Sequence, residues 1–416
     1  MQMSRAASDS QIDPPLPALD ALIVGRAASL FASDLDAEQP KIDAMFRGAR
    51  VLVVGGGGSI GAITVRLLLD YHPVAIHVVD LSENYLAELV RDLRSSAQRI
   101  PVADFRTLPL DYGSGIMARF LAEAKPYDVV LNFAALKHVR SEKDTYSVLQ
   151  MLDTNLVKHA RFITWLRDYG HAARYFAVST DKAANPSSIM GASKRLMEDV
   201  AFDFSPAGSG SCTSARFANV AFSNGSLLQS FLTRLEKRQP LAAPRGTRRY
   251  FVARREAGEI CVLAAATVPD RHIAIPTLDP ATHLQALDEI ATTVLTHFAY
   301  RAVVYDDEAA AIRDLETLAA RGEWPLVMTP LDTSGEKPYE EFTGDGESAI
   351  PIGLTALRGI RHADNPLIDE NFIAILGRLI EEWNAPVSKG DLAALLSSAL
   401  PTFHHVETGK NLDQRV

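Results

Sequence analysis

The chain contains little cysteine and no long apolar run. Its 416 residues include only Cys212 and Cys261, which are too few for a disulfide framework and are typical of a reducing compartment. No stretch reaches the roughly 18 uninterrupted apolar residues of a membrane-spanning helix. Residues 1–20 also lack the basic and then apolar order of a secretion signal. These absences predict a soluble, cytoplasmic protein whose N-terminal residues form a flexible arm.

An excess of positive charge is missing as well. The sequence has 42 Lys and Arg against 51 Asp and Glu, a formal net charge of −9. Binding to nucleic acid or to an anionic membrane is therefore not expected as the main activity. Cysteine and histidine do not gather at metal-ligand spacings, since His404 and His405 form an isolated pair, and no metal is expected. The length allows one large domain with additions, or two to three domains.

Apolar strand patterns alternate with helical patterns over residues 50–201. The expected strands are 50–54, 75–79, one that ends at 110–112, 128–133 and 175–179. The expected helices between and after them are 62–71, 83–96, 115–124, 155–166 and one that continues to 201. This alternation predicts the α/β class with a doubly wound parallel sheet, in which ligands bind beyond the carboxyl ends of the strands.

A glycine-rich loop follows the first expected strand and precedes a helix. Its candidate cofactor-binding residues are Gly55, Gly58, Ser59, Ile60 and Gly61. Glycine at a tight turn lets the backbone approach a pyrophosphate, and the N-terminus of the following helix favours negative charge. Asp80 ends the second strand about twenty positions later, where a carboxylate can bind a ribose 2′-hydroxyl and favour NAD over NADP. The alternative for Asp80 is a solvated loop aspartate.

The ends of the third and fourth expected strands supply further candidates. The cofactor-binding candidates there are Asp111, Tyr112, Ala134 and Ala135. The two alanines are small enough to let the strand end pack against a cofactor. Lys137 and His138 follow them and are either substrate-binding groups or part of a polar rim.

Three polar residues in a row end the strand at 175–179: Thr180, Asp181 and Lys182. A carboxylate beside an ammonium at the mouth of a parallel sheet is a plausible acid–base pair. Lys194 follows Met190 by four positions, the spacing of the Tyr-x-x-x-Lys pair of short-chain dehydrogenases, so methionine stands at the tyrosine position. These five residues are the catalytic candidates.

The second half of the chain contains further candidate residues for substrate binding. Residues 245–255 form a basic segment in an acidic protein, and Arg249 is the preferred diphosphate ligand because a guanidinium fork pairs with phosphate oxygens. A solvated strand edge is the alternative for this segment. Asn219 and Ser223 are further substrate-binding candidates. From about residue 365 the pattern is helical, which suggests a tail that packs on another subunit.

Together these stretches resemble extended short-chain dehydrogenases/reductases of the polysaccharide-biosynthesis group, the UDP-N-acetylglucosamine 4,6-dehydratases. The matching stretches are GGGGSIG, AALKHV, Thr154-Asn155, STDKAANPSSIMGASKR, RFANVAFSNGS, RRYFVARREA and GEKPYEEF, in the family's order over roughly residues 45–345. Val54 replaces the threonine that commonly precedes the first glycine, which affects only local hydrogen bonding. Met190 resembles the branch that lacks the tyrosine, and that resemblance implies retention of configuration at C5 of the sugar.

The resemblance also implies a domain order and binding partners. The expected units are an N-terminal arm and linker (1–45), an NAD-binding Rossmann domain (46–240), a nucleotide-sugar-binding region interleaved with it (241–345) and a helical C-terminal extension (346–416). NAD is the implied cofactor and UDP-N-acetylglucosamine the implied substrate. A homo-oligomer is expected, because such enzymes usually pair through two helices.

The implied reaction oxidises C4 of the sugar, eliminates water across C5 and C6, and returns the hydride to C6. Lys182 would take the C5 proton, for which it must be neutral, and a neighbouring cation such as Lys194 would favour that state. Lys194 would also hold the nicotinamide ribose, and Asp181 would protonate the leaving C6 hydroxyl. Since Met190 has no proton to exchange, we hypothesise that Asp181, directly or through Thr180 or water, accepts the O4 proton. Asp181 and Lys182 can then share one proton and titrate as a pair.

Three alternatives stay open on the sequence alone. A nucleotide-sugar epimerase of the same fold would oxidise C4 without expelling water, and a 4,6-dehydratase could also epimerise C5. A non-catalytic NAD-binding scaffold would retain the fold, with Met190 marking the loss of catalysis. Release of water separates a dehydratase from an epimerase, and substrate-dependent change at the nicotinamide separates an enzyme from a scaffold.

Overall fold

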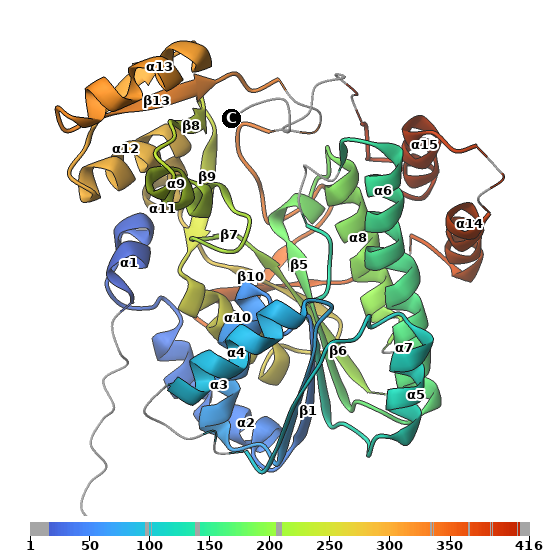
Figure 1. Ribbon diagram of the computed structural model, residues 1–416. Helices are drawn as coiled ribbons and strands as arrows, with labels where there is room; N and C mark the ends of the chain where they lie inside the picture. The colour runs from blue at the N-terminus through green and yellow to red at the C-terminus, as the bar shows by residue number, and fades with distance from the viewer. Residues whose placement is uncertain are drawn as a thin grey trace, which may run out of the picture.

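A nine-stranded sheet forms the centre of the computed structural model (Figure 1), with the strand order β14-β15-β10-β6-β5-β4-β1-β2-β3. The structure describes residues 16–95, 100, 102–137, 142–204, 210–332, 335, 337–364, 367–382, 384, 386–405 and 407. The strands of this sheet are β1 (Arg50–Val54), β2 (Ala75–Val79), β3 (Asp104–Leu108), β4 (Val129–Asn132), β5 (Arg174–Thr180), β6 (Ser211–Phe217), β10 (His272–Pro276), β14 (Ala349–Pro351) and β15 (Leu357–Arg361). The pairing is parallel from β3 to β10, and β15 is antiparallel to both of its neighbours. The predicted doubly wound parallel α/β fold is confirmed.

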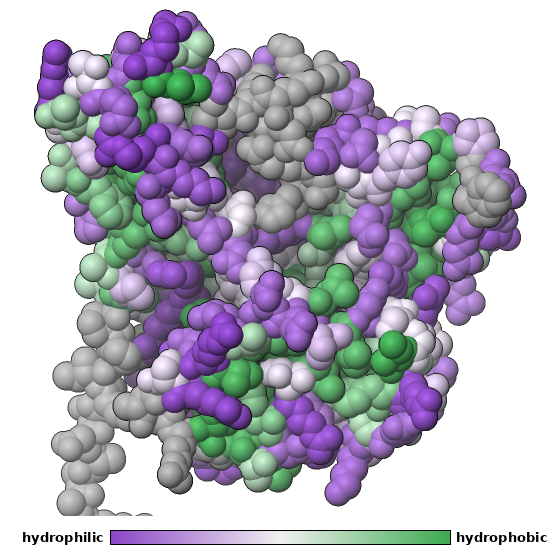
Figure 2. All heavy atoms as spheres, in the orientation of Figure 1, coloured by the Kyte–Doolittle hydropathy of each residue, from purple (hydrophilic) through white to green (hydrophobic). Residues whose placement is uncertain are grey.

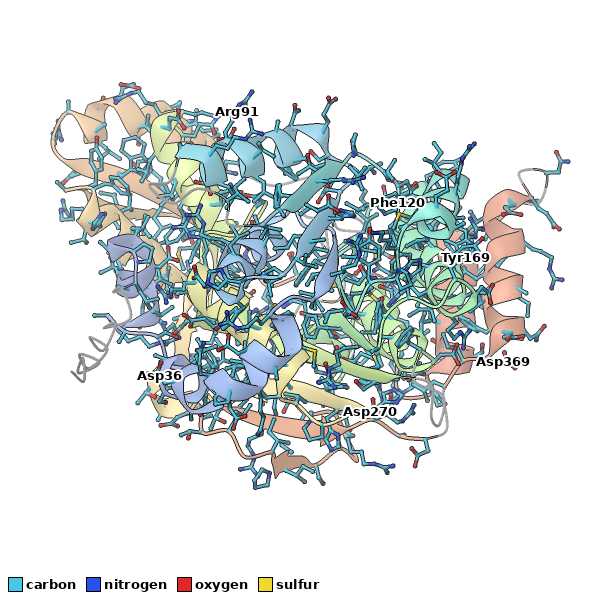
Figure 3. All side chains as sticks on the ribbon, turned by 90° about the horizontal axis from the view of Figure 1, so that it is seen from below. Asp36, Arg91, Phe120, Tyr169, Asp270 and Asp369 are labelled. Atoms are coloured by element: carbon cyan, nitrogen blue, oxygen red, sulfur yellow. The ribbon has the colours of Figure 1, made fainter. Side chains whose placement is uncertain are left out.

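Helices cover both faces of the sheet because side chains alternate along each apolar strand. In β1, Val51 and Val53 face one hydrophobic core, whereas Leu52 and Val54 face the other. The first core is closed by α2 (Ala32–Phe46), α3 (Ser59–Leu68), α4 (Glu83–Ser95) and α10 (Arg254–Ala266). The second is closed by α5 (Gly115–Glu123), α6 (Thr145–Leu152), α7 (Lys158–Asp168) and α8 (Ile189–Phe202). Figure 3 shows the two layers from below, with Asp36 on the first side and Phe120 and Tyr169 on the second.

A smaller α/β unit lies at the upper left of Figure 1. Its parallel sheet has the order β12-β13-β8, and a second three-stranded sheet has the order β11-β9-β7. The strands are β7 (Asn219–Val220), β8 (Leu241–Pro244), β9 (Arg248–Val252), β11 (Leu284–Ala286), β12 (Arg301–Tyr305) and β13 (Glu323–Thr329). The helices are α1 (Ala18–Val24), α9 (Leu227–Glu236), α11 (Pro280–His283), α12 (Leu287–His297) and α13 (Glu308–Ala319). The chain returns to the large sheet through β10, so the segment 241–345 contributes to both units.

The C-terminal segment differs from the expected helical extension in its first part. Residues 349–351 and 357–361 form β14 and β15 and add an antiparallel edge to the large sheet. Only α14 (Glu370–Glu381) and α15 (Lys389–Ala399) match the predicted helices. Helix α15 packs on α6 and α8, and α14 packs on the turn at residues 153–157 that follows α6. Figure 2 shows hydrophobic side chains at the surface on this side, at the right of the view. Within the described ranges, every helix is too short or too polar to cross a membrane.

Several element boundaries also differ from the sequence prediction. Helix α3 begins at Ser59, three residues earlier than expected, and β3 ends at Leu108, before the predicted strand end at 110–112. Short 3₁₀ turns cover Leu69–Tyr71 and Asp181–Ala183. The expected helix 155–166 is present as α7 from Lys158 onward, but its first residues belong to a π-helical turn, Asp153–Val157, between α6 and α7. Such turns are rare and are frequently found at functional sites.

A buried ion pair fixes α8 against the sheet. Arg216 on β6 is fully buried, and its guanidinium donates two hydrogen bonds of 2.8 Å to Glu198 on α8. The same guanidinium also pairs with Glu347, and Ser179 on β5 donates to Glu198 at 2.6 Å. Burial alone would raise the pKa of Glu198, but the charge and hydrogen bonds of Arg216 overcome this and bring the pKa down to about 2.

Replacing Arg216→Ala should lower the free energy of unfolding by up to about 3–5 kcal/mol at neutral pH, because the buried Glu198 carboxylate loses its main charge partner and keeps, of its described ion pairs, only that with Arg195, at 3.0 Å. The folded-state pKa of Glu198 lies below its ordinary value of 4.5. The stabilisation is therefore present above about pH 4.5 and is lost as the pH falls toward about 2. Denaturant unfolding as a function of pH measures this, with Arg361→Ala as the control.

Arg361 pairs with Asp364 at 3.0 Å on the surface, so its replacement should cost less than about 1 kcal/mol. Equal stability of Arg216→Ala and the unchanged protein at neutral pH would contradict the role assigned to the buried pair.

Candidate active site

A cavity of about 780 Å³ lies at the carboxyl ends of β1, β2, β4 and β5, between the large sheet and the smaller unit. It brings together all five catalytic candidates, Thr180, Asp181, Lys182, Met190 and Lys194. It is also lined by all the cofactor candidates, Gly55, Gly58, Ser59, Ile60, Gly61, Asp80, Asp111, Tyr112, Ala134, Ala135 and Lys194. Of the substrate candidates, Lys137, Asn219 and Ser223 line it, Arg249 does not, and His138 lies outside the described residues.

The glycine loop forms a wall without side chains. Gly55 has φ +71°, and a Cβ there would lie 2.6 Å from the Ala134 backbone nitrogen. A Cβ on Gly61 would lie 2.5 Å from the Gly55 oxygen, so the first turn of α3 packs directly on the loop. A Cβ on Gly58 would meet only the Gly55 oxygen, at 3.4 Å. The loop and the N-terminus of α3 thus offer a concave, electropositive surface that fits a phosphate group.

Two aspartates that line the cavity also accept hydrogen bonds from neighbouring groups of the protein. Asp80 accepts hydrogen bonds from the Gly57 N–H at 3.0 Å and from the Ser82 N–H at 2.9 Å. Asp111 accepts from the Lys158 ammonium at 2.6 Å. Lys158 also lines the cavity and was not predicted from the sequence, because only the fold brings α7 next to the end of β3.

Asn155 is a second residue whose role the sequence did not reveal. Its fully buried amide accepts the Leu136 N–H at 2.9 Å and donates to the Leu136 carbonyl and to the Ser193 hydroxyl, both at 3.0 Å. These bonds hold the segment 134–137 between the π-helical turn and α8. The only sequence signal was its position in the matching pair Thr154-Asn155.

The three polar residues at the end of β5 form one hydrogen-bonded group. The Thr180 hydroxyl donates to Asp181 Oδ1 at 2.8 Å, and the Lys182 ammonium donates to the same oxygen at 3.0 Å. Asp181 is 2% exposed, and its buried Oδ2 has no hydrogen-bond partner among the described residues. A buried carboxylate oxygen without a partner is costly, and here it lies in a group that lines the cavity. The arrangement can therefore accept a hydrogen bond from a ligand hydroxyl.

A second carboxylate, Glu340, lies next to Lys182. The Glu340 Oε1 is 4.0 Å from Lys182 Nζ and 3.9 Å from Arg249 Nη2. Burial raises the pKa of Glu340, and the Lys182 and Arg249 charges only partly offset this. The charged groups within ion-pair distance of Lys182 in the described structure are thus two carboxylates. The sequence marked the surrounding segment as charged but gave no reason to place Glu340 beside Lys182.

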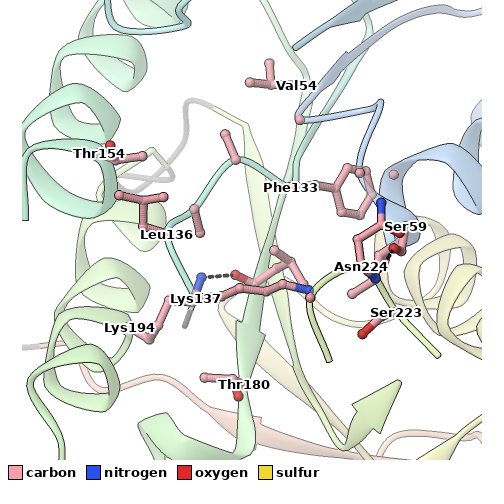
Figure 4. Close-up of a pocket in the computed structure, with 18 of the residues that line it drawn as sticks. Val54, Ser59, Phe133, Leu136, Lys137, Thr154, Thr180, Lys194, Ser223 and Asn224 are labelled. Carbon is pink, nitrogen blue, oxygen red and sulfur yellow. Dashed lines mark hydrogen bonds between the residues drawn. The ribbon is translucent and has the colours of Figure 1, made fainter. Parts of the chain in front are cut away.

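Lys194 lies on α8, one turn after Met190, and is almost fully buried. Its Nζ donates to the Val178 carbonyl at 2.8 Å and contacts Met197 Sδ at 3.0 Å. Figure 4 shows Lys194 at the wall of the cavity. Burial lowers the pKa of Lys194 to about 7, with Glu198 opposing the shift and Lys137 adding to it. Lys137, rather than Lys182, is therefore the lysine that acts on Lys194.

Met190, at the position of the missing tyrosine, is almost fully buried among protein atoms. Met190 is 2% exposed, and its backbone N–H donates to the buried Glu142 carboxylate at 2.9 Å. Burial raises the pKa of Glu142, and the backbone hydrogen bond opposes the shift. A thioether has no proton to exchange, so Met190 cannot take part in proton transfer in this cavity.

The basic segment is occupied by contacts within the chain. Arg249 donates to the backbone carbonyls of Arg248 at 2.8 Å, Lys337 at 3.0 Å and Pro338 at 3.2 Å. Arg254 pairs with Asp20 at 2.8 Å, and Arg255 pairs with Glu259 at 2.6 Å. Arg249 thus fastens β9 to the segment that carries Glu340, and a role as a phosphate ligand stays a prediction.

Replacing Gly55→Ala should lower the unfolding temperature, because the new Cβ would collide with the backbone of Ala134 and φ +71° strains any L side chain. The matched control, Gly58→Ala, meets no atom closer than 3.4 Å and should leave the unfolding temperature nearly unchanged. Thermal unfolding of the two ligand-free variants tests the packing. Equal losses in both would show that the loop does not pack on β4 in this way.

Solved structures of similar fold support this architecture. Pen from Bacillus thuringiensis superposes with a TM-score of 0.61 at 20% identity, over 77% of this chain and 90% of Pen. DesIV, a dTDP-glucose 4,6-dehydratase from Streptomyces venezuelae with NAD and TYD bound, superposes with a TM-score of 0.54 at 18% identity. That match covers 71% of this chain and 88% of DesIV.

Curated relatives match at greater identity over shorter stretches. An uncharacterized membrane protein of Methanocaldococcus jannaschii, MJ1061, is 31% identical over 203 residues, which are 48% of this chain and 57% of the relative. The UDP-N-acetylglucosamine 4,6-dehydratase (inverting) of Campylobacter jejuni is 28% identical over 212 residues, 49% of this chain and 60% of the relative. The chain thus spans somewhat more than half the length of these relatives. The model of a family described as polysaccharide biosynthesis protein matches residues 51–351, and the chain belongs to this family.

Proposed function

We propose that the chain is an NAD-dependent nucleotide-sugar 4,6-dehydratase that acts on UDP-N-acetylglucosamine. The observation that carries the proposal is the Thr180–Asp181–Lys182 group, which lies in the same cavity as the glycine loop and Lys194. A hydride acceptor and an acid–base group must face the same sugar in such a reaction. The names of the Campylobacter relative and of DesIV support the reaction class.

The residues of the cavity fit a bound dinucleotide. The open Gly58 position and the N-terminus of α3 suit a pyrophosphate, and Asp80 lies where a ribose hydroxyl would need an acceptor. Ala134 and Ala135 leave room beside β4, and Lys194 would donate to the nicotinamide ribose. Bound NAD would supply the chemistry of hydride removal from C4 and of hydride return to C6.

Asp181 is the proposed acceptor of the O4 proton. Thr180 already donates its hydroxyl proton to Asp181 Oδ1 at 2.8 Å, so the lone pairs of the threonine oxygen can accept a proton from O4 while its own proton passes to Asp181. Direct transfer to the unpartnered Asp181 Oδ2 is the alternative route. In both routes Asp181 gains one proton, which it later delivers to the C6 oxygen as water leaves.

Lys182 is the proposed base at C5, and its two carboxylate neighbours control it. A Lys182 ammonium is stabilised by ionised Asp181 at 3.0 Å and would be stabilised further by ionised Glu340 at 4.0 Å. Burial favours the neutral form of Glu340. To take the C5 proton, Lys182 must start as the amine, and the proton that it takes makes it an ammonium. In the same elimination Asp181 gives its proton to the leaving C6 hydroxyl, so an ionised carboxylate again stands beside that ammonium.

The proposal predicts a defined product from UDP-N-acetylglucosamine in D2O. The product should have lost water, carry deuterium at C5, and retain the C5 configuration, as the resemblance of Met190 to the tyrosine-lacking branch suggests. Mass spectrometry and NMR of the sugar measure these three properties. An epimer without loss of water would instead identify an epimerase. An unchanged sugar, with NAD bound, would favour the scaffold.

Two variants should separate the steps. Asp181→Asn should slow enzyme-bound NADH formation by about 10²–10⁴-fold, because the O4 proton then has no acceptor. Lys182→Ala should still form NADH on addition of the sugar but should release no water, since the C5 proton stays in place. Stopped-flow absorbance follows the first step and product analysis the second. Rapid NADH formation by Asp181→Asn, or unimpaired turnover by Lys182→Ala, would contradict the assigned roles.

A further inference from the structure

One hydrogen bond joins the glycine loop to the loop at residues 223–226. The Asn224 backbone N–H donates to Ser59 Oγ at 2.8 Å, and Figure 4 shows the two residues side by side at the edge of the cavity. Ser59 is the first residue of α3, one of the helices that cover the large sheet. Asn224 precedes α9 of the smaller unit. Both residues line the cavity, so the bond connects its two halves.

The chemistry of the serine hydroxyl lets it serve both halves at once. A hydroxyl has one donor and two acceptor positions, and the Asn224 N–H uses an acceptor position. Among the described residues Ser59 donates its own proton to no acceptor. Its O–H group lies at the N-terminus of a ten-residue helix, beside the open Gly58 position that fits a phosphate. A phosphate oxygen there would accept the Ser59 proton and turn the lone pairs toward Asn224.

The loop that receives this bond is attached firmly to the smaller unit. Phe222 has φ 54°, an unfavourable conformation for a phenylalanine, and its side chain is 5% exposed in the core of the smaller unit. The Ser226 N–H donates to the Ser223 carbonyl at 2.9 Å, and the Ser226 hydroxyl caps α9. These contacts make the loop move with the smaller unit, so the bond to Ser59 helps to set the width of the cavity.

We propose that Ser59 is a positioning residue that couples the two ligands of the cavity: a dinucleotide phosphate orients its hydroxyl, and the hydroxyl fixes the loop at 223–226 for the nucleotide sugar. Each ligand then raises the affinity for the other, and by linkage the two factors are equal. The inference rests on the proposed function, which names NAD and a UDP-sugar as the two ligands. It does not depend on which base removes which proton.

Calorimetric titration of the full chain, freed of nucleotide, tests this coupling. UDP is titrated with and without saturating NAD, and NAD is titrated with and without saturating UDP. We expect each ligand to raise the affinity for the other roughly 3- to 10-fold, the range that one hydrogen bond supplies. In Ser59→Ala, the factor by which one ligand raises the affinity for the other should fall to about 1, whatever the variant's affinity for either ligand alone.

Two further variants keep the result interpretable. Ser59→Cys retains the side-chain volume with a weaker acceptor and should also lose most of the coupling, even if Ser59→Ala folds poorly. Ser223→Ala removes a cavity hydroxyl from the same loop and should change the UDP affinity while leaving the coupling factor intact. Coupling in Ser59→Ala and Ser59→Cys equal to that of the unchanged protein, or no coupling in the unchanged protein, would overturn the inference. Failure of the unchanged protein to bind NAD or UDP would overturn the proposed function instead.

Discussion

The buried Arg216–Glu198 pair is the interaction on which the geometry of the site depends. It joins β6 to α8, and Ser179 on β5 donates to the same carboxylate. Two charges taken out of water are costly unless their geometry is good and their remaining positions are satisfied, and here Arg216 makes two bonds to Glu198 and also pairs with Glu347. Burial is the main cause of the lowered pKa of Lys194, one turn before Glu198, and the Glu198 charge opposes it only in part. The pair that fixes α8 thus also fixes the buried position of Lys194.

Methionine at position 190 removes the hydroxyl that a tyrosine would place on α8. Here α8 offers the thioether of Met190 and a lysine held by a carbonyl and a second thioether. Asp80, Asp111 and Tyr112 also line the cavity, but Asp181 is the carboxylate whose Oδ1 both Thr180 and Lys182 bond. In the proposed mechanism this one carboxylate serves O4 and C6 in turn, so it must keep the proton that it gains in the first step until water leaves.

The sequence predicted those parts of the site that depend on local pattern. Apolar periodicity marks the strand ends, and at these ends lie the strand–glycine–helix unit, Asp80 and the run Thr180–Asp181–Lys182. The periodicity was therefore enough to predict the fold class, which is confirmed, and these residues of the cavity wall. Glu340, Lys158 and Glu142 were missed because tertiary contacts alone bring them to the site. Arg249 has a chemistry that suits a diphosphate but does not line the cavity, and its guanidinium bonds the carbonyls of Arg248, Lys337 and Pro338, so its phosphate role stays a prediction. Similarly, the side-chain bonds of Asn155 to Leu136 accompany a π-helical turn where periodicity predicted an ordinary helix.

The two halves of the cavity meet at polar contacts, and some of these involve residues of the proposed site. The Asn224 N–H reaches Ser59 of the glycine loop, Glu340 faces Lys182, and Arg249 fastens the segment that carries Glu340. A shift of the smaller unit would therefore change both the shape of the sugar site and the carboxylates around Lys182. The electrostatic effect of Glu340 falls with its distance from Lys182. The position of the segment that carries Glu340 therefore sets part of the electrostatic environment of Lys182, the base at C5 in the proposed mechanism.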